Sequence, residues 1–145
     1  MTTSENGKQL IISFEGIKLN AYKCPAGVPT IGVGNTFYKN GNKVKMGDKV
    51  TLPQAMELFE SLLPKYEKIV LDAIKVPLTQ NQFDALVSFC WNCGSSKTLF
   101  KMVNEKFSEM NIVGFWTSHY IMGGGKVLNG LVRRRKAEAT LFVKK

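Results

Sequence analysis

The chain of 145 residues has the length of one globular domain, and its 44% hydrophobic residues suffice for a buried core. These values exclude a disordered or low-complexity protein. The 20 basic residues against 11 acidic ones give a net charge of +9, which indicates a polyanionic partner: nucleic acid, an acidic membrane surface or an anionic polymer. No stretch of about 20 apolar residues predicts a membrane span. The N-terminus lacks the pattern of a signal peptide, and three cysteines are too few for a disulfide scaffold, which favours a reducing compartment.

The first predicted element is a helix over residues 4–14 that ends at Gly16. Residues 16–50 follow and are rich in glycine and short β-prone segments. Thr30–Val33 is predicted to be a strand, and Phe37 begins another one. Asn40-Gly41 is a strong hairpin-turn signal, because both residue types tolerate positive φ. This region is therefore predicted to form a small, twisted antiparallel sheet.

From residue 51 the apolar spacing becomes helical. Thr51 with Gln54 and Thr79 with Gln82 are capping boxes that predict two helix starts. Pro64 is expected to kink or restart the first of these helices, and Gly94 to stop the second. Three more helices are predicted: one that begins at Ser95 or Ser96 and carries Leu99, Phe100, Val103 and Phe107, one over residues 113–120 before the glycines 123–125, and one over residues 129–142 capped by Asn129. The order predicts an α+β fold.

Three residue types with chemical roles lie around the predicted sheet. Glu15 ends the first helix, Cys24 follows after eight residues, and Thr30 follows after five more. We expect Glu15 to lie at the seam between helix and sheet, where partial removal from water keeps a carboxyl protonated, as a general acid requires. If the chain folds back as a sheet, these three side chains converge on one cleft.

This spacing, followed by Ile31-Gly32-Val33-Gly34, resembles the phage-type lysozymes (endolysins) of glycoside hydrolase family 24. The resemblance continues through residues 78–94 and ends over residues 124–138, so it spans nearly the whole chain. It implies a lysozyme-like α+β fold in one domain of residues 1–145. A small antiparallel sheet lobe of about residues 12–50 and a mostly helical lobe of residues 1–11 and 51–145 are expected to have a cleft between them.

The resemblance implies hydrolysis of the β-1,4 bond between N-acetylmuramic acid and N-acetylglucosamine in peptidoglycan, for lysis of a bacterial host. It implies that Glu15 is the general acid and that Thr30 holds the attacking water. Cys24 stands where the family carries Asp or, less often, Cys. A free thiol is mostly neutral at pH 7, so the roles of base, nucleophile or water-positioning group stay open for Cys24.

The resemblance also implies substrate contacts and a supporting group. The expected substrate-binding residues are Gly34, Thr36, Trp91 and Asn92. Arg134 is the arginine of the basic run 133–136 that is expected to turn inward and pair with Glu15 or its neighbourhood. The other members are expected to be surface charge, because a helix spreads four consecutive residues over all its sides. This argues against a nucleic-acid-binding patch.

No cofactor or metal is expected. Cys90 and Cys93 lie late in a predicted helix and are interpreted as core residues rather than as a redox pair, and His119 is alone. The expected partners are peptidoglycan and a separate holin, with no nucleic acid and no stable membrane insertion. We expect a monomer that accumulates in the host cytoplasm until it is released to the wall.

Two alternatives stay open at this stage. The first is a lytic transglycosylase that uses Glu15 alone, motivated by the absence of a second carboxylate where glycosidases usually have two. The second is a non-catalytic basic module that binds a wall polymer or nucleic acid.

Overall fold

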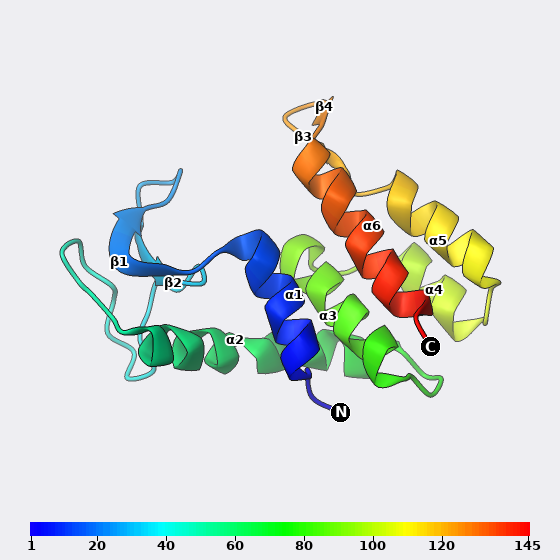
Figure 1. Ribbon diagram of the computed structural model, residues 1–145, viewed down its shortest axis with the longest axis horizontal. Helices are drawn as coiled ribbons and strands as arrows, with labels where there is room; N and C mark the ends of the chain where they lie inside the picture. Colours follow the sequence, from blue (N-terminus) through cyan, green and yellow to red (C-terminus); the bar gives the residue numbers. More distant parts are fainter. The chain divides into compact units, whose positions relative to one another are not determined.

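The computed structural model describes all 145 residues and contains helices and short antiparallel strands (Figure 1). In chain order the elements are α1 (Glu5–Glu15), β1 (Lys18–Lys23), β2 (Pro29–Gly32), α2 (Leu52–Ala73), α3 (Gln80–Cys93), α4 (Lys97–Asn104), α5 (Glu109–Ser118), β3 (Met122–Gly123), β4 (Lys126–Val127) and α6 (Asn129–Val143). The predicted α+β class is confirmed. The chain divides into two compact units, which we call the sheet unit (residues 11–64) and the helical unit (residues 1–10 and 65–145). No helix is long and apolar enough to cross a membrane.

In the sheet unit, β1 pairs antiparallel with β2, so that Tyr22 lies opposite Thr30. The predicted strand at Phe37 is wrong, because Phe37 forms only a single bridge, with Lys43. The turn between these two residues contains Gly41 at φ +87°, as the Asn-Gly signal predicts. The sheet is therefore smaller than expected, and loop segments complete the unit.

The core of the sheet unit explains where its boundary falls. Ile31, Val44 and Leu58 form its buried cluster. Leu58 belongs to α2. Its backbone carbonyl oxygen accepts a hydrogen bond of 3.1 Å from the side-chain amide of the buried Asn35. The first half of α2 thus packs with the sheet, and the sheet unit extends to Pro64. The helix continues through Pro64, so the expected restart does not occur.

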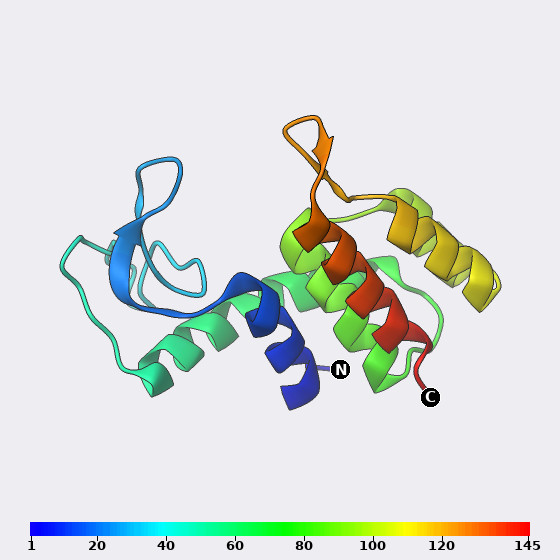
Figure 2. The ribbon, with the colours of Figure 1, turned by 45° about the horizontal axis from the view of Figure 1, so that its top comes forward.

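In the helical unit, α6 packs beside α3 and α5 (Figures 1 and 2). The apolar faces of these helices bury large side chains, among them Trp116, Phe83, Phe89 and Phe142. Burial of this kind supplies roughly 1.5–3 kcal/mol for each large apolar side chain, which is the main stabilising contribution here. Cys90 lies on the same buried face of α3, as its interpretation as a core residue predicts.

Most helix-boundary predictions in this unit are confirmed. The Thr79 capping box begins α3, Gly94 ends it at φ +83°, and Ser96 caps α4 through the backbone N–H of Leu99. The helix predicted over residues 113–120 begins earlier, at Glu109, because Ser108 caps it by accepting from Asn111.

Three further predictions are wrong. Asn129 does not cap α6, since Leu128 occupies the cap position without a side-chain hydrogen bond. Phe107 lies beyond α4 and is 44% exposed. The glycines 123–125 were expected only to break a helix, but Gly124 and Gly125, both at positive φ, turn a short hairpin of β3 and β4. Figure 2 shows this hairpin next to the start of α6.

Candidate functional site

Cys24 and Thr30 are brought together by the turn between β1 and β2. The backbone N–H of Cys24 donates to the carbonyl of Val28 at 3.0 Å, and the N–H of Gly27 donates to the carbonyl of Cys24 at 2.8 Å. Thr30 sits in β2 with only 2% of its surface exposed, and its hydroxyl lies 2.9 Å from the carbonyl oxygen of Val28. The hydroxyl also interacts with the Cys24 sulfur. The turn therefore presents a thiol next to a buried hydroxyl.

The surroundings of Cys24 favour its ionised form. The backbone N–H of Val28 is the largest cause that lowers the pKa of the Cys24 thiol, followed by that of Ala26, and the Thr30 hydroxyl adds to them. Partial burial opposes these hydrogen bonds and does not overcome them. Hydrogen-bond donors that point at a sulfur stabilise the thiolate relative to the thiol. A cation, which the sequence argument required, is therefore not needed to lower this pKa.

Glu15 is the last residue of α1, which ends as predicted at Gly16, whose φ is +76°. Glu15 is exposed. The reason is its place at the very end of the helix, one residue before the connection to β1.

Gly34 and Thr36 follow β2 in the sheet unit. A reciprocal pair of backbone hydrogen bonds between Ile31 and Asn35, both 2.9 Å, makes a tight turn around Gly34. Gly34 is exposed with a φ of +77°, a conformation that side chains other than glycine rarely adopt. Thr36 is half-buried and its carbonyl accepts from Val44. Five of the predicted site residues thus lie in the sheet unit, namely Glu15, Cys24, Thr30, Gly34 and Thr36.

The other three predicted residues, Trp91, Asn92 and Arg134, belong to the helical unit. Trp91 is half-buried, and its ring lies 4.7 Å from that of Tyr66, measured between centroids. Asn92 is exposed near the end of α3. Trp91 thus offers an aromatic ring, and Asn92 a hydrogen-bonding amide, in the last turn of α3.

Arg135 is a residue that the sequence argument missed. It was expected to be surface charge, but it is fully buried. Its Nη2 donates to the Asn92 side-chain oxygen at 2.8 Å, and its Nη1 donates to the sulfur of Cys93. Because Arg135 donates to the oxygen, the NH2 group of Asn92 remains as a hydrogen-bond donor. The i, i+3 spacing of Arg135 and Glu138 is the sequence signal that identifies this inward face.

Glu138 anchors both inward-turned arginines. Its carboxylate lies 3.2 Å from Nε of Arg134 and 2.9 Å from Nε of Arg135, and it accepts from Ser88 at 2.6 Å and from Trp116 at 3.2 Å. Burial raises the pKa of Glu138, and the guanidinium of Arg135 opposes that rise most strongly, with Ser88, Arg134 and Trp116. Arg134 is 3% exposed, so it turns inward as expected, and it also donates to the carbonyl of Ser88 at 3.2 Å.

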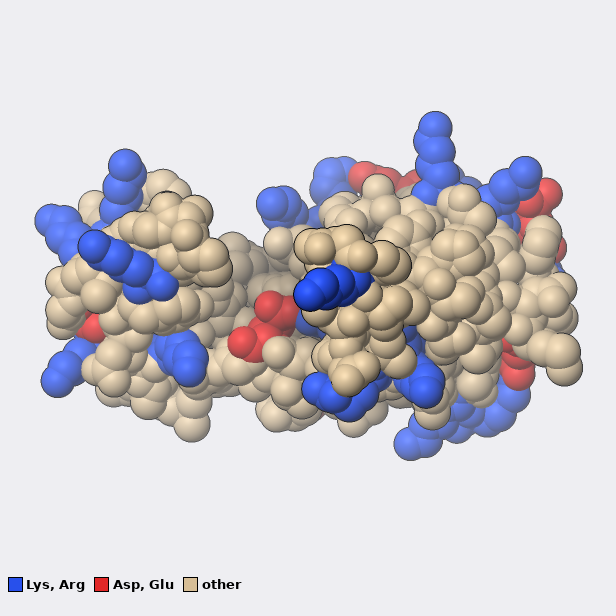
Figure 3. All heavy atoms as spheres, turned by 90° about the horizontal axis from the view of Figure 1, so that it is seen from above, with Lys and Arg blue, Asp and Glu red and all other residues tan.

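The remaining polar chemistry of the chain is simpler. All three cysteines are free, and no group of three or more His, Cys, Asp and Glu side chains is placed to hold a metal. Burial raises the pKa of Cys90 to about 12, with Glu138 as the next cause, which makes Cys90 inert. Figure 3 shows that Lys and Arg side chains project at many separate places on the face it displays, rather than in one patch.

Comparisons with known proteins place this chain among phage enzymes. The endolysin of Acyrthosiphon pisum secondary endosymbiont phage 1 is 36% identical over 148 residues, which cover 98% of each chain. A protein of Pseudomonas phage phiKMV named SAR-endolysin is 41% identical over 133 residues, covering 88% of this chain and 80% of the relative. The solved structure of a phage P22 lysozyme mutant has a TM-score of 0.87 at 32% identity and covers 99% of both chains.

The structural likeness confirms the lysozyme-like fold predicted from the sequence. The family model described as Phage lysozyme matches residues 12–138. This match includes Glu15, Cys24 and Thr30 as well as Trp91, Asn92 and Arg134. The chain therefore belongs to the phage lysozyme family, the muramidases of glycoside hydrolase family 24.

Proposed function

We propose that this chain is an endolysin that hydrolyses the β-1,4 bond between N-acetylmuramic acid and N-acetylglucosamine, with Glu15 as general acid and Cys24 with Thr30 as the water-activating pair. The two units then act as the lobes of one lysozyme domain. The observation that carries the proposal is the set of hydrogen bonds that lowers the pKa of Cys24 beside the buried Thr30 hydroxyl. Family membership supports hydrolysis over the transglycosylase and binding-module alternatives.

The proposed reaction moves two protons. Glu15 gives its proton to the glycosidic oxygen as the bond from that oxygen to the sugar's anomeric carbon breaks. Water, held by the Thr30 hydroxyl, bonds to the anomeric carbon and loses a proton to the Cys24 thiolate. The products are two shortened glycans, one with a free hydroxyl and one with a reducing end. The thiolate takes the place of the second carboxylate that glycosidases usually have.

To act as a general acid, Glu15 needs to be shielded from water, because it is exposed in the chain without substrate. A general acid must hold its proton until the glycosidic bond breaks. We infer that the bound glycan itself covers Glu15 and excludes water from it. Removal of water favours the protonated form of a carboxyl, so substrate binding and the readiness of the acid are coupled.

The decisive measurement is clearing of permeabilised bacteria, followed by mass spectrometry of the released fragments. Wild type is expected to clear the suspension and leave reducing ends, whereas Glu15→Gln is expected to be inactive. The matched control is Glu5→Gln, at the exposed other end of the same helix, which should keep full activity. Fragments with 1,6-anhydro ends would overturn hydrolysis, and full activity of Cys24→Ala would overturn the role of the thiol.

The release route is a separate part of the proposal. We infer a monomer that stays in the host cytoplasm until a holin releases it to the peptidoglycan. A 41% identical relative is named SAR-endolysin, so this route needs its own test. Expression in bacteria without a holin should leave cells intact until the membrane is permeabilised, and spontaneous lysis would contradict the holin requirement. Sedimentation of the purified protein as a dimer would contradict the monomer.

A further inference from the structure

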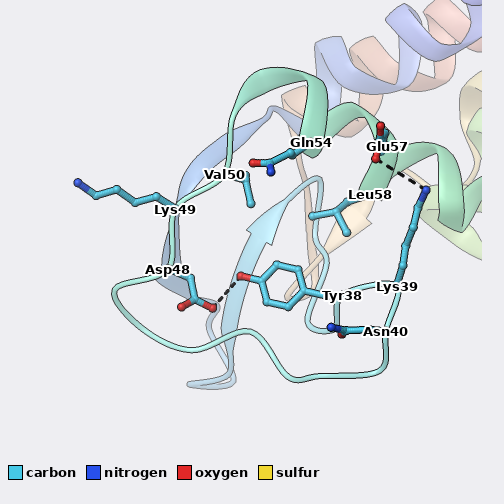
Figure 4. Close-up of a pocket in the computed structure, with 9 residues that line it drawn as sticks. All are labelled: Tyr38, Lys39, Asn40, Asp48, Lys49, Val50, Gln54, Glu57 and Leu58. Carbon is cyan, nitrogen blue, oxygen red and sulfur yellow. Dashed lines mark hydrogen bonds and ion pairs between the residues drawn. The ribbon is translucent and has the colours of Figure 1, made fainter.

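The sheet unit contains a pocket that the proposed reaction does not use. Its volume is about 550 Å³, within the usual range of roughly 300–1,000 Å³ for sites that bind small ligands. Figure 4 shows the nine residues that line it, which are Tyr38, Lys39, Asn40, Asp48, Lys49, Val50, Gln54, Glu57 and Leu58. None of the predicted site residues is among them. The pocket is therefore a second candidate binding site within the sheet unit.

One wall of the pocket is an aromatic ring held in a fixed position. The Tyr38 hydroxyl donates to the Asp48 carboxylate at 2.7 Å, and the N–H of Lys45 donates to the same oxygen at 2.9 Å. Desolvation and Asp48 raise the pKa of Tyr38 to about 12, and the Lys45 N–H is the largest cause that lowers the pKa of Asp48. The bond therefore persists over a wide pH range, and the ring is positioned before any ligand arrives.

Two amide side chains supply hydrogen-bond donors to the pocket. The Gln54 side-chain oxygen accepts from the backbone N–H of Thr51 at 2.8 Å. The Asn40 side-chain oxygen accepts from the backbone N–H of Asn42 at 2.9 Å. Because each oxygen is occupied by the backbone, each side chain has its NH2 group left for a ligand. In Figure 4 the two amides lie on opposite sides of the Tyr38 ring.

The positive and negative side chains that line the pocket are equal in number. Lys39 lies 4.0 Å from Glu57 as an ion pair, and Lys49 and Asp48 carry one charge of each sign. A lining with two lysines and two carboxylates does not select a polyanion. What it offers is an aromatic face, apolar contacts from Val50 and Leu58, and amide donors. These features fit a neutral ligand that has an apolar face and acceptor oxygens.

We propose that this pocket binds an N-acetylhexosamine unit of the glycan strand as an anchoring contact away from the catalytic residues. The sugar's apolar face packs on Tyr38, and its hydroxyl and acetamido oxygens accept from Asn40 and Gln54. Such a contact keeps the enzyme on the insoluble wall between cleavages, because a second tethered contact raises the local concentration of substrate. The pocket would bind the glycan without taking part in its cleavage, which is a role beyond the proposed function.

The test uses full-length protein with Glu15→Gln as the background, so that the probe, an N-acetylglucosamine trimer, is not cleaved. Asn40→Asp and Gln54→Glu keep the accepting oxygens, and with them the turn and the helix cap, but remove both NH2 donors. Gln82→Glu is the matched control for Gln54→Glu, because it adds the same single charge to an equivalent capping box at the start of α3. Binding is followed residue by residue by NMR.

The trimer is expected to shift the backbone signals of Tyr38, Asn40 and Gln54. The double variant should weaken this binding about tenfold, which is the usual effect of losing two modest hydrogen bonds, and Gln82→Glu should not change it. In an active Glu15 background, the double variant should clear insoluble walls several-fold more slowly but cleave short soluble glycans at the wild-type rate. Shifts confined to residues 30–36, or unchanged binding in the double variant, would overturn the pocket. Neither result depends on whether Glu15 is catalytic.

Discussion

The buried carboxylate of Glu138 offers the sharpest test of how the helical unit is held together. Replacing it in Glu138→Gln keeps the size of the side chain but removes its charge. Arg134 and Arg135 are 3% and 0% exposed, so both guanidinium groups would stay buried without their anion. The new NH2 group would replace one of the two carboxylate oxygens and could no longer accept from the donor at that oxygen, which is Ser88 at Oε2 or Trp116 at Oε1.

The expected loss of stability follows from these contacts. Removing one partner of a buried ion pair usually costs about 3–5 kcal/mol, because the remaining charge is left without compensation. For a chain of this size each kcal/mol lowers the melting temperature by about 2–4 °C, so the drop should be about 6–20 °C. Urea denaturation followed by circular dichroism gives the free energy of unfolding, and calorimetry gives the melting temperature.

The matched control is Glu109→Gln. Glu109 lies 2.6 Å from Lys145, but both side chains are more than half exposed, so the loss should be at most about 1 kcal/mol. If Glu138→Gln and Glu109→Gln unfold at the same urea concentration, the buried cluster does not contribute as argued. A double variant that also removes Arg135 should recover part of the loss, since fewer unpaired buried charges remain.

Three other predictions concern the site and the pocket. If the Asn92 amide contacts substrate as the family resemblance implies, Arg135→Lys should raise KM several-fold with a smaller change in kcat, measured at temperatures where the variant is fully folded. The exposed Arg133→Lys should change neither constant. Activity should fall as the pH drops through the lowered pKa of Cys24, since only the thiolate accepts a proton. In Cys24→Asp this fall in activity should move to lower pH, because a carboxyl has a lower pKa than a thiol. A pH profile that does not move would show that Cys24 is not the base. Absorbance titration should find one tyrosine that ionises near pH 12, and Asp48→Asn should lower the pH of this ionisation. If the ionisation near pH 12 persists in Tyr38→Phe, it belongs to another residue.

Local signals in the sequence predicted the helical elements well, because a cap or a stop involves only near neighbours. The two capping boxes and Gly94 act within one turn of their helices, so the printed residues suffice to recognise them. The cap at Ser108 was missed because the first residues of α5, Glu109 to Asn111, are all exposed and show no buried apolar period. The β3–β4 hairpin was missed because a run of glycines is compatible with both a break and a tight turn.

Glu15, Cys24 and Thr30, the proposed catalytic residues, show what sequence spacing does and does not determine. The spacing of Cys24 and Thr30 correctly predicted their approach, because an antiparallel pair with a short turn brings such residues together. The ionisation of Cys24 was not predictable, since its donors are backbone N–H groups of the turn rather than a neighbouring cation. The exposure of Glu15 likewise depends on packing around the end of α1.

The basic run at residues 133–136 joins stability to function in one feature. A helix turns about 100° per residue, so two consecutive arginines point in different directions. Both can still reach one buried anion that lies four residues after the first and three residues after the second. Glu138 meets that requirement for Arg134 and Arg135. A buried ion cluster is a weak source of stability compared with apolar packing, because its charges lose their hydration. At its other end, Arg135 donates to the Asn92 side-chain oxygen and so orients that amide. The buried charges of the cluster therefore reduce stability, and the same cluster fixes the orientation of the Asn92 amide.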